Sequence, residues 1–113
     1  IGAGDPAAGV LANHDFHMQI ARLCGNAYIW PAVVRMLMDH TRLLSMFYEG
    51  TSKKGKKRGR QAADQHDALI AAIDAGDAEA AARIALEHWQ MTEARIDALL
   101  KPSALPVEPP VAP

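Results

Sequence analysis

The spacing of apolar residues constrains the fold of this chain more than any other feature of its sequence. Apolar side chains recur every three or four positions over most of residues 1–100, which is the period of an α-helix rather than of a β-strand. Alanine and leucine dominate these stretches, and β-branched residues are scarce. The pattern therefore predicts an all-α protein built as an antiparallel helical bundle.

Local signals divide the periodic region into helical segments. Pro6 suits the first turn of a helix, Gly25 suits a helix end, and Asp77 can cap the helix that follows the turn at residues 75–77. The helices are predicted over residues 6–25, 27–49, 60–74 and 78–100.

Composition sets the domain organisation. Residues 1–101 are predicted to form one domain, whereas residues 102–113 contain five prolines and no periodicity, which predicts a disordered tail. No apolar run reaches the roughly 20 residues that a membrane span needs, so no membrane association is expected. The single cysteine, Cys24, excludes an internal disulfide and suits a reducing compartment, so a cytoplasmic location is expected.

Residues 51–60 carry a dense run of lysine and arginine. The run contains two glycines and lies between two predicted helices, so we expect a mobile, solvated loop. Basic side chains could contact phosphate, but no aromatic residue is interleaved to stack on bases. No specific role follows for this run.

Three predicted helices each place one histidine at the centre of an apolar stripe, namely His17, His66 and His88. A buried polar group without a partner is costly, so each ring needs a hydrogen-bond partner or a metal. His66 and His88 lie at similar distances on either side of the turn at Gly76, so an antiparallel pair brings them to the same height. One divalent ion would satisfy all three rings, since neutral imidazole is a common ligand. A hydrogen-bonded network without metal is the alternative.

Other polar residues are less strongly predicted to belong to this metal site. Asn13 precedes His17 by four positions, so both side chains share one helix face and could hold the same ion. His40 lies on an apolar stripe without a second inward ligand and is expected to be core or to line a pocket. His14 and Asp15 lie off the stripe and are expected to be solvated.

Two phrases of the sequence resemble a known family. NHDFHMQIARLCGN at residues 13–26 resembles the pattern D-x-x-F-H-x-x-I-x-x-x-x-G-N, and HDALIAAIDAGDAEAA at residues 66–81, closing on His88, resembles H-x-x-[IL]-x-x-A-[IL]-x-x-G-D-x-x-x-A…H. Both are signatures of the FadR C-terminal-like (FCD) domain, the effector-binding half of GntR-type transcription regulators. The resemblance covers about residues 10–100.

The resemblance implies a function as well as a fold. In metal-binding members an aspartate and three histidines hold zinc, nickel or a similar ion, and these positions fall on Asn13, His17, His66 and His88. Asn13 departs from the pattern, because an amide oxygen is a neutral donor. Metal affinity would then be lower, or a carboxylate effector would supply the missing charge and reinforce metal binding.

The resemblance also implies partners. Family effectors are mostly small organic acids, and Arg35, Arg42 and His40 are candidate contacts for one, whereas Asn26, Tyr48 and Trp89 could line a pocket or simply pack. A homodimer is expected. The family fold has more helices than are predicted here, and the extra ones, with the winged helix-turn-helix that binds DNA, are expected upstream of this chain.

The leading hypothesis is therefore a non-enzymatic sensor domain that binds a divalent metal, zinc or nickel, and a small organic acid. A metalloenzyme in a helical bundle is a distant rival, because the inward stripes offer no Asp or Glu as a general base. A metal-free helical interaction module is the third possibility.

Overall fold

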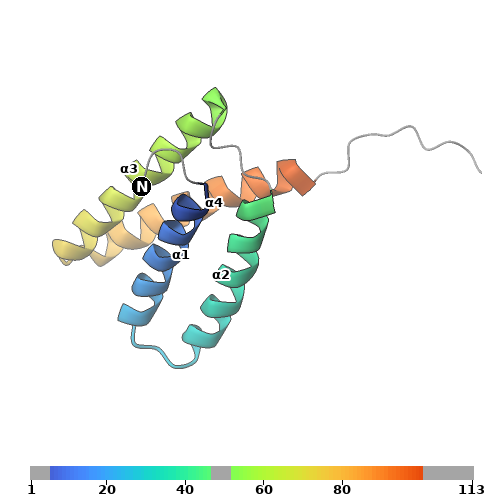
Figure 1. The fold of residues 1–113 in the computed structure, drawn as a ribbon. Helices are drawn as coiled ribbons and strands as arrows, with labels where there is room; N and C mark the ends of the chain where they lie inside the picture. Colours follow the sequence, from blue (N-terminus) through green and yellow to red (C-terminus); the bar gives the residue numbers. More distant parts are fainter. Residues whose placement is uncertain (1–5, 47–51, 101–113) are drawn as a thin grey trace, which may run out of the picture.

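The computed structural model describes residues 6–46 and 52–100, and these residues fold entirely into helices and the turns between them. The all-α prediction is thus confirmed. The predicted tail at 102–113 and Tyr48 lie outside the described residues. The helices, labelled in Figure 1, are α1 (Pro6–Leu23), α2 (Ile29–Met46), α3 (Lys53–Asp74) and α4 (Ala78–Leu100).

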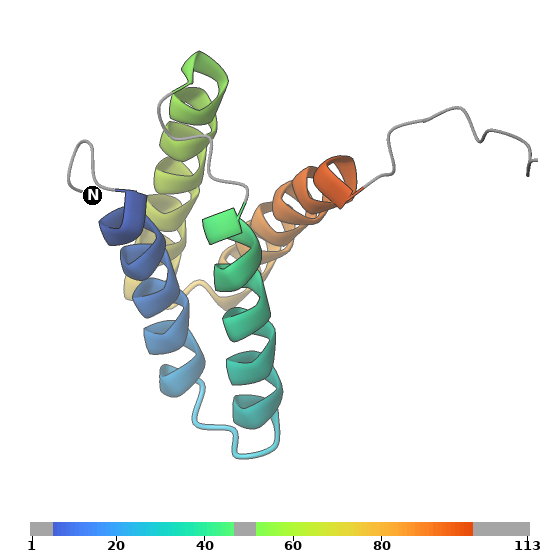
Figure 2. The same cartoon turned by 45° about the vertical axis from the view of Figure 1, so that its right-hand side comes forward.

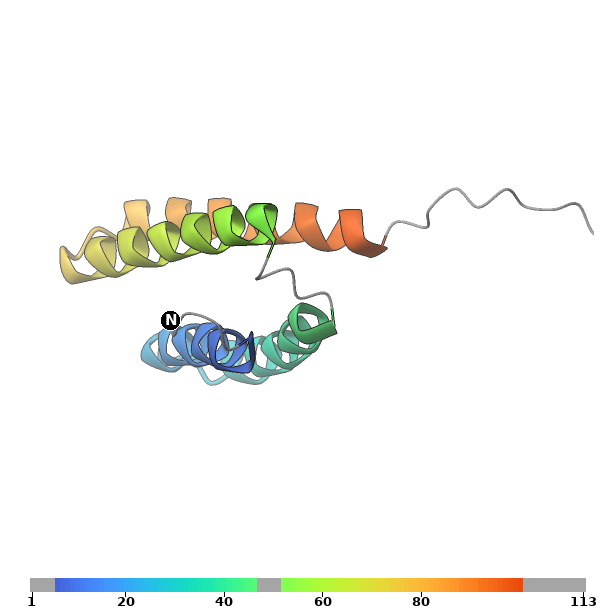
Figure 3. The same ribbon diagram turned by 45° about the horizontal axis from the view of Figure 1, so that its top comes forward.

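The helices form two antiparallel hairpins, α1 with α2 and α3 with α4. Figure 3 shows the hairpins as two layers, with α3 and α4 in one and α1 and α2 in the other. Figure 2 shows the same arrangement from another side, with α4 running across the end of α2 that leads to α3. Residues from all four helices can therefore meet where the layers face each other.

The α1–α2 connection follows from Gly25 and Asn26. Gly25 has a φ of 63°, a left-handed conformation that glycine adopts without strain. The side chain of Asn26 then accepts hydrogen bonds from the backbone amides of Tyr28 and Ile29, at 2.9 and 3.1 Å, and so caps α2. Asn26 is therefore a capping residue rather than part of a pocket, and α2 begins two residues later than predicted.

The α3–α4 connection is a Schellman turn. Gly76 has a φ of 69°, and its amide donates to the carbonyl of Ile73. The amide of Asp77 donates to the carbonyl of Ala72. The Asp77 carboxylate accepts from the amide of Ala80 at 3.0 Å, which confirms the predicted cap of α4. This tight turn fixes the register in which α3 and α4 pack.

The predicted basic loop is wrong over most of its length, because α3 begins at Lys53 rather than at Arg60. The Ser52 side chain caps this end by accepting from the amide of Gly55 at 2.9 Å. Lysine and arginine are good helix formers, and they outweigh the two glycines once a cap is present. The basic residues are therefore held in the first turns of a helix.

The interior combines few apolar side chains with several histidines. The described apolar residues that are buried are small or aliphatic, namely Ala21, Leu37, Leu69 and Ala72. His17, His40 and His88 are equally buried, at 5–7% exposure. Among the described residues, no helix is long and apolar enough to cross a membrane. The centre of the molecule is therefore polar, and its imidazoles need partners.

Candidate metal centre and adjoining pocket

His17, His66 and His88 come together where α1 meets α3 and α4. The Nε2 atom of His88 lies 3.3 Å from Nε2 of His17 and 3.3 Å from Nε2 of His66. One ligand nitrogen from each ring lies within 4.8 Å of the other two. The predicted convergence of the three rings, and the equal height of His66 and His88, are confirmed. We call these residues the histidine triad.

Two of these separations fit the coordination of one ion. Two imidazole nitrogens bound tetrahedrally to zinc at about 2.0–2.1 Å lie about 3.3 Å apart. Both contacts of the His88 nitrogen match that separation. The triad supplies three neutral nitrogen donors, a set that suits zinc or nickel, and it leaves at least one coordination position for a further ligand.

Gln65 orients the ring of His88. The Nδ1 atom of His88 donates to Oε1 of Gln65 at 2.7 Å, which leaves Nε2 of the same ring as a lone-pair acceptor. That lone pair can accept a hydrogen bond from the Nε2–H of His17 or of His66 but not from both, although both lie equally close. A hydrogen-bonded network therefore leaves one of these contacts unsatisfied, whereas a cation at the centre satisfies all three rings.

Aromatic side chains hold the other rings. Phe16 stacks on His66 with ring centroids 4.0 Å apart and an interplanar angle of 14°. Trp89 lies against His17, with centroids 5.1 Å apart. Packing of this kind restricts ring rotation, so the nitrogens stay aimed at a common point. Phe16 is the phenylalanine of the first signature, and its stacking on His66 gives it a place beside the triad.

The triad imidazoles are neutral at neutral pH. Burial, followed by the neighbouring charges of His66 and His88, lowers the pKa of His17 from 6.5 to about 3. Burial and His88 lower the pKa of His66 to about 4. Burial also lowers the pKa of His88. Neutral imidazole is the form that binds a metal, so no proton must be removed before an ion enters at pH 7.

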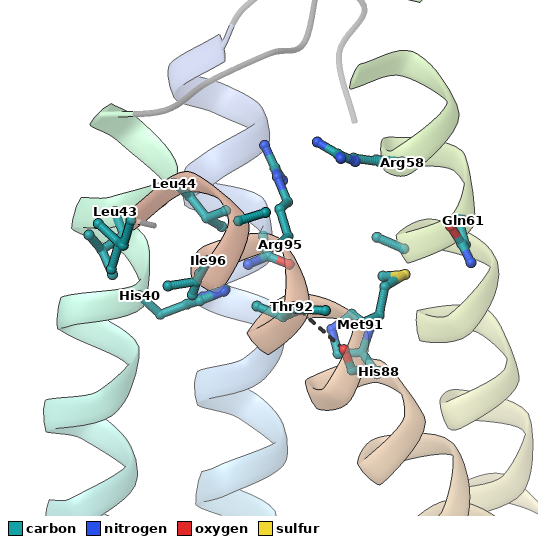
Figure 4. Close-up of a pocket in the computed structure, with 15 residues that line it drawn as sticks. His40, Leu43, Leu44, Arg58, Gln61, His88, Met91, Thr92, Arg95 and Ile96 are labelled. Atoms are coloured by element: carbon teal, nitrogen blue, oxygen red, sulfur yellow. Dashed lines mark hydrogen bonds between the residues drawn. The ribbon is translucent and has the colours of Figure 1, made fainter. Parts of the chain in front are cut away.

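A pocket of about 320 Å³ adjoins the triad, and we call it the triad pocket. All four helices contribute to it, and His88 connects it to the triad. Its lining contains two arginines and, among the described residues, no aspartate or glutamate (Figure 4). The polar lining residues are Asn13, His40, Arg58, Gln61, His88, Thr92 and Arg95.

His40 points from α2 into the triad pocket (Figure 4). Its side chain is buried, and neither Nδ1 nor Nε2 has a hydrogen-bond partner. Burial, and then the charges of His88 and Arg95, lower its pKa. The ring therefore carries one N–H donor and one acceptor that the described residues do not satisfy, which is costly in the absence of a ligand. The expectation that His40 lines a pocket is confirmed.

The other predicted effector contacts lie elsewhere. Arg35 lines a second groove, between α2 and α4, together with Asp39, Glu93 and Asp97. Arg42 is mostly exposed, lines neither cavity, and forms an ion pair with Asp39 at 3.7 Å. The carboxylates around Arg35 make the second groove a poor site for an anion.

The remaining predictions near the site have mixed outcomes. Asp15 is exposed, as expected, but His14 is half-buried, and its Nδ1 atom bonds with Oγ1 of Thr41 at 2.8 Å. The prediction that His14 is solvated was wrong because α2 packs over that side of α1 and provides a partner. Asn13 lines the triad pocket, as His88 does. Sequence reasoning did not single out Phe16, Gln65, Arg58 or Arg95.

Comparison with known proteins identifies a family over most of the helical region. Residues 1–91 match the family model of the FCD domain. The matched range contains α1, α2, α3 and the part of α4 that carries His88, and so includes the entire triad. No curated protein and no solved structure matches the chain.

Proposed function

Because the chain belongs to the FCD family, the C-terminal effector domains of GntR and FadR regulators, we propose that it is a sensor that binds one divalent metal and a small organic acid. FCD domains are regulatory. In the full regulator, occupancy of the site would change the affinity for DNA of a separate winged helix-turn-helix domain. The metal would be held by His17, His66 and His88, with zinc or nickel as the ion.

Mutual proximity of three neutral imidazole nitrogens supports metal binding most directly. The triad joins α1 to both helices of the second hairpin, so an ion held there would tie the two layers together. It would also polarise whatever occupies the remaining coordination position. The protein's own contribution is to hold the rings at a fixed spacing, through Phe16, Trp89 and Gln65.

Asn13 is the proposed fourth protein ligand. It lies one helical turn before His17 and lines the same cavity as His88. Three imidazoles and an amide carry no negative charge, so they leave the two positive charges of the ion uncompensated. An organic acid in the triad pocket would supply a carboxylate, which the described lining residues do not, and metal and acid would then strengthen each other's binding by the same factor.

The position of the triad pocket supports a role in switching. Its lining comes from both hairpins, so an occupant contacts both layers at once. A ligand that prefers one packing of the layers over another shifts the population toward it. Exposed apolar side chains on α1 and α2, including Leu11, Ile29 and Met38, support the proposal that a second copy packs against the domain.

Metal content of the purified chain tests this function. After incubation with excess zinc or nickel and removal of free ion, we expect about one ion per chain by elemental mass spectrometry, and a higher melting temperature that a chelator reverses. His66→Ala should lose the ion. Asn13→Asp should bind the ion more tightly, because a carboxylate compensates its charge.

His14→Ala is the matched control. His14 lies on α1 near His17, but its ring bonds with Thr41, outside the triad, so this variant should keep the metal. Circular dichroism of each variant separates a lost ligand from a lost fold. A folded wild-type chain that takes up neither ion, or a His66→Ala variant that binds as much as the wild type, would refute the proposal.

A further inference from the structure

One side of α3, near the residue where the helix begins, carries four cations. They occupy positions i, i+3, i+4 and i+7, so they share one helix face and span about 10 Å along the axis. All four are exposed, whereas Arg58, in the same turns, lines the triad pocket. We call these four residues the basic face, namely Lys53, Lys56, Lys57 and Arg60.

The charge of the basic face opposes the stability of its own helix. Like charges three or four residues apart on a helix repel each other, and every member of the face has a neighbour at both spacings. Positive charge is also unfavourable in the first turn of a helix, and the first turn of α3 has no acidic residue. Among the residues that the structure describes, no carboxylate is in ion-pair contact with any of the four. The fold gains nothing from this concentration of charge, which an external polyanion would neutralise.

The residues of these turns favour the backbone of a duplex nucleic acid over other polyanions. Proteins bind single strands by stacking aromatic side chains on the bases, and a helix that lies on a membrane inserts large apolar side chains. Residues 52–61 contain neither kind of side chain. The phosphates of a duplex are bound by lysine and arginine alone, without regard to base sequence.

The place of α3 in the fold agrees with duplex DNA as that partner. Figures 1 and 2 show that α1 and α3 begin toward the same end of the molecule, away from the α1–α2 turn. In the proposed regulator the winged helix-turn-helix domain precedes the FCD domain and joins it ahead of α1. DNA held by that domain would therefore approach the end of the molecule where the basic face begins.

We propose that the basic face binds the phosphate backbone of duplex DNA, next to the segment that the winged helix-turn-helix domain recognises. The choice of DNA rests on the proposed function, but the contact is an additional one, made by the sensor domain itself. It involves neither the metal nor the triad pocket. It would add affinity without base specificity, and that affinity would fall steeply with salt.

Fluorescence anisotropy of a short labelled duplex of arbitrary sequence, titrated with the whole chain, tests the proposal. The logarithm of the association constant should fall with the logarithm of the salt concentration with a slope of about −3 to −4, because each neutralised phosphate contributes about −0.9. Lys56→Gln combined with Arg60→Gln should reduce the steepness of that slope by about 2 and weaken binding at least about tenfold at about 50 mM salt. These substitutions relieve like-charge repulsion, so they should not lower the melting temperature, and weaker binding would not come from unfolding.

Arg35→Gln combined with Arg42→Gln is the charge-matched control, because both arginines are exposed on α2, away from the basic face. This variant should keep the affinity and the slope of the wild type. The proposal is overturned if the chain binds no duplex up to about 10⁻⁴ M in about 50 mM salt, or if the control loses as much affinity as the basic-face variant. Tighter binding to a single strand of the same length, or to phosphatidylserine vesicles at equal phosphate concentration, would also overturn it.

Metal content, measured on the same samples, separates this inference from the proposed function. The basic-face variant should take up as much zinc or nickel as the wild type. A chain that holds the metal but binds no duplex would refute the DNA contact and keep the sensor. A chain without metal that binds the duplex through the basic face would do the reverse.

Discussion

At the scale of a single residue, Gln65 orients one ring of the histidine triad, that of His88. Its amide oxygen fixes the proton of His88 on Nδ1 and so presents Nε2 to the other two rings. Partners of this kind raise the basicity of a ligand and hold its orientation, and their removal typically costs about 10–100-fold in metal affinity. The residue thus matters to the site although it is not one of the three histidines proposed to hold the metal.

Gln65→Met removes this hydrogen bond while keeping a side chain of similar length. We expect zinc affinity to fall by about 10–100-fold, measured by competition with a chromophoric chelator, while the fold is retained. Gln90→Met, at an exposed position of α4, should leave the affinity unchanged. Equal affinities in the two variants would mean that Gln65 does not orient His88.

At the scale of the helices and turns, the turns determine where the histidines of the triad lie. The Schellman turn at Gly76 sets the register of α3 against α4 and so brings His66 level with His88. The caps at Ser52, Asn26 and Asp77 start the three helices that follow. The turn at Gly76 and the cap at Asp77 were predicted from the sequence. Asn26 was expected to line a pocket or to pack, and at Ser52 the density of charge and glycine in the following residues obscured the start of α3.

Gly76→Ala tests the contribution of the turn. A β-carbon there meets no atom within 4 Å, so the cost arises from the left-handed backbone alone and should be about 1–2 kcal/mol of unfolding free energy. Gly59→Ala, also in open space but within α3, should instead stabilise the chain by about 0.5–1 kcal/mol. Urea unfolding of both zinc-free variants gives the comparison, and a Gly76→Ala chain as stable as the wild type would contradict it.

At the scale of the whole molecule, the two hairpins meet through buried histidines more than through a broad apolar core. Without metal, this interior is sensitive to acid. His17 and His66 stay neutral in the folded state down to a pKa of about 3 and about 4, whereas in the unfolded chain they accept protons near 6.5. Between these values the unfolded state binds more protons, so acid favours unfolding.

We therefore expect the unfolding free energy of chelator-treated protein to be constant above about pH 7 and to fall as the pH drops from about 6.5 toward 4, by up to about 1.4 kcal/mol per pH unit for each such histidine. Burial lowers the pKa of His40 and of His88 as well, so both add to the slope. Urea unfolding at pH 7 and pH 5 measures the effect. His17→Gln should reduce the slope, and identical unfolding free energies at the two pH values would contradict the expectation.

The sequence by itself determined the helices, most of their ends and the three inward histidines, because helical periodicity and capping are local properties of the chain. It also carried the signatures of the FCD family. The sequence did not show that Thr41 reaches His14, that Gln65 orients His88, or that Arg58 and Arg95 share one cavity. Each of these pairs joins residues from different helices, so only the packing of the two hairpins brings them together.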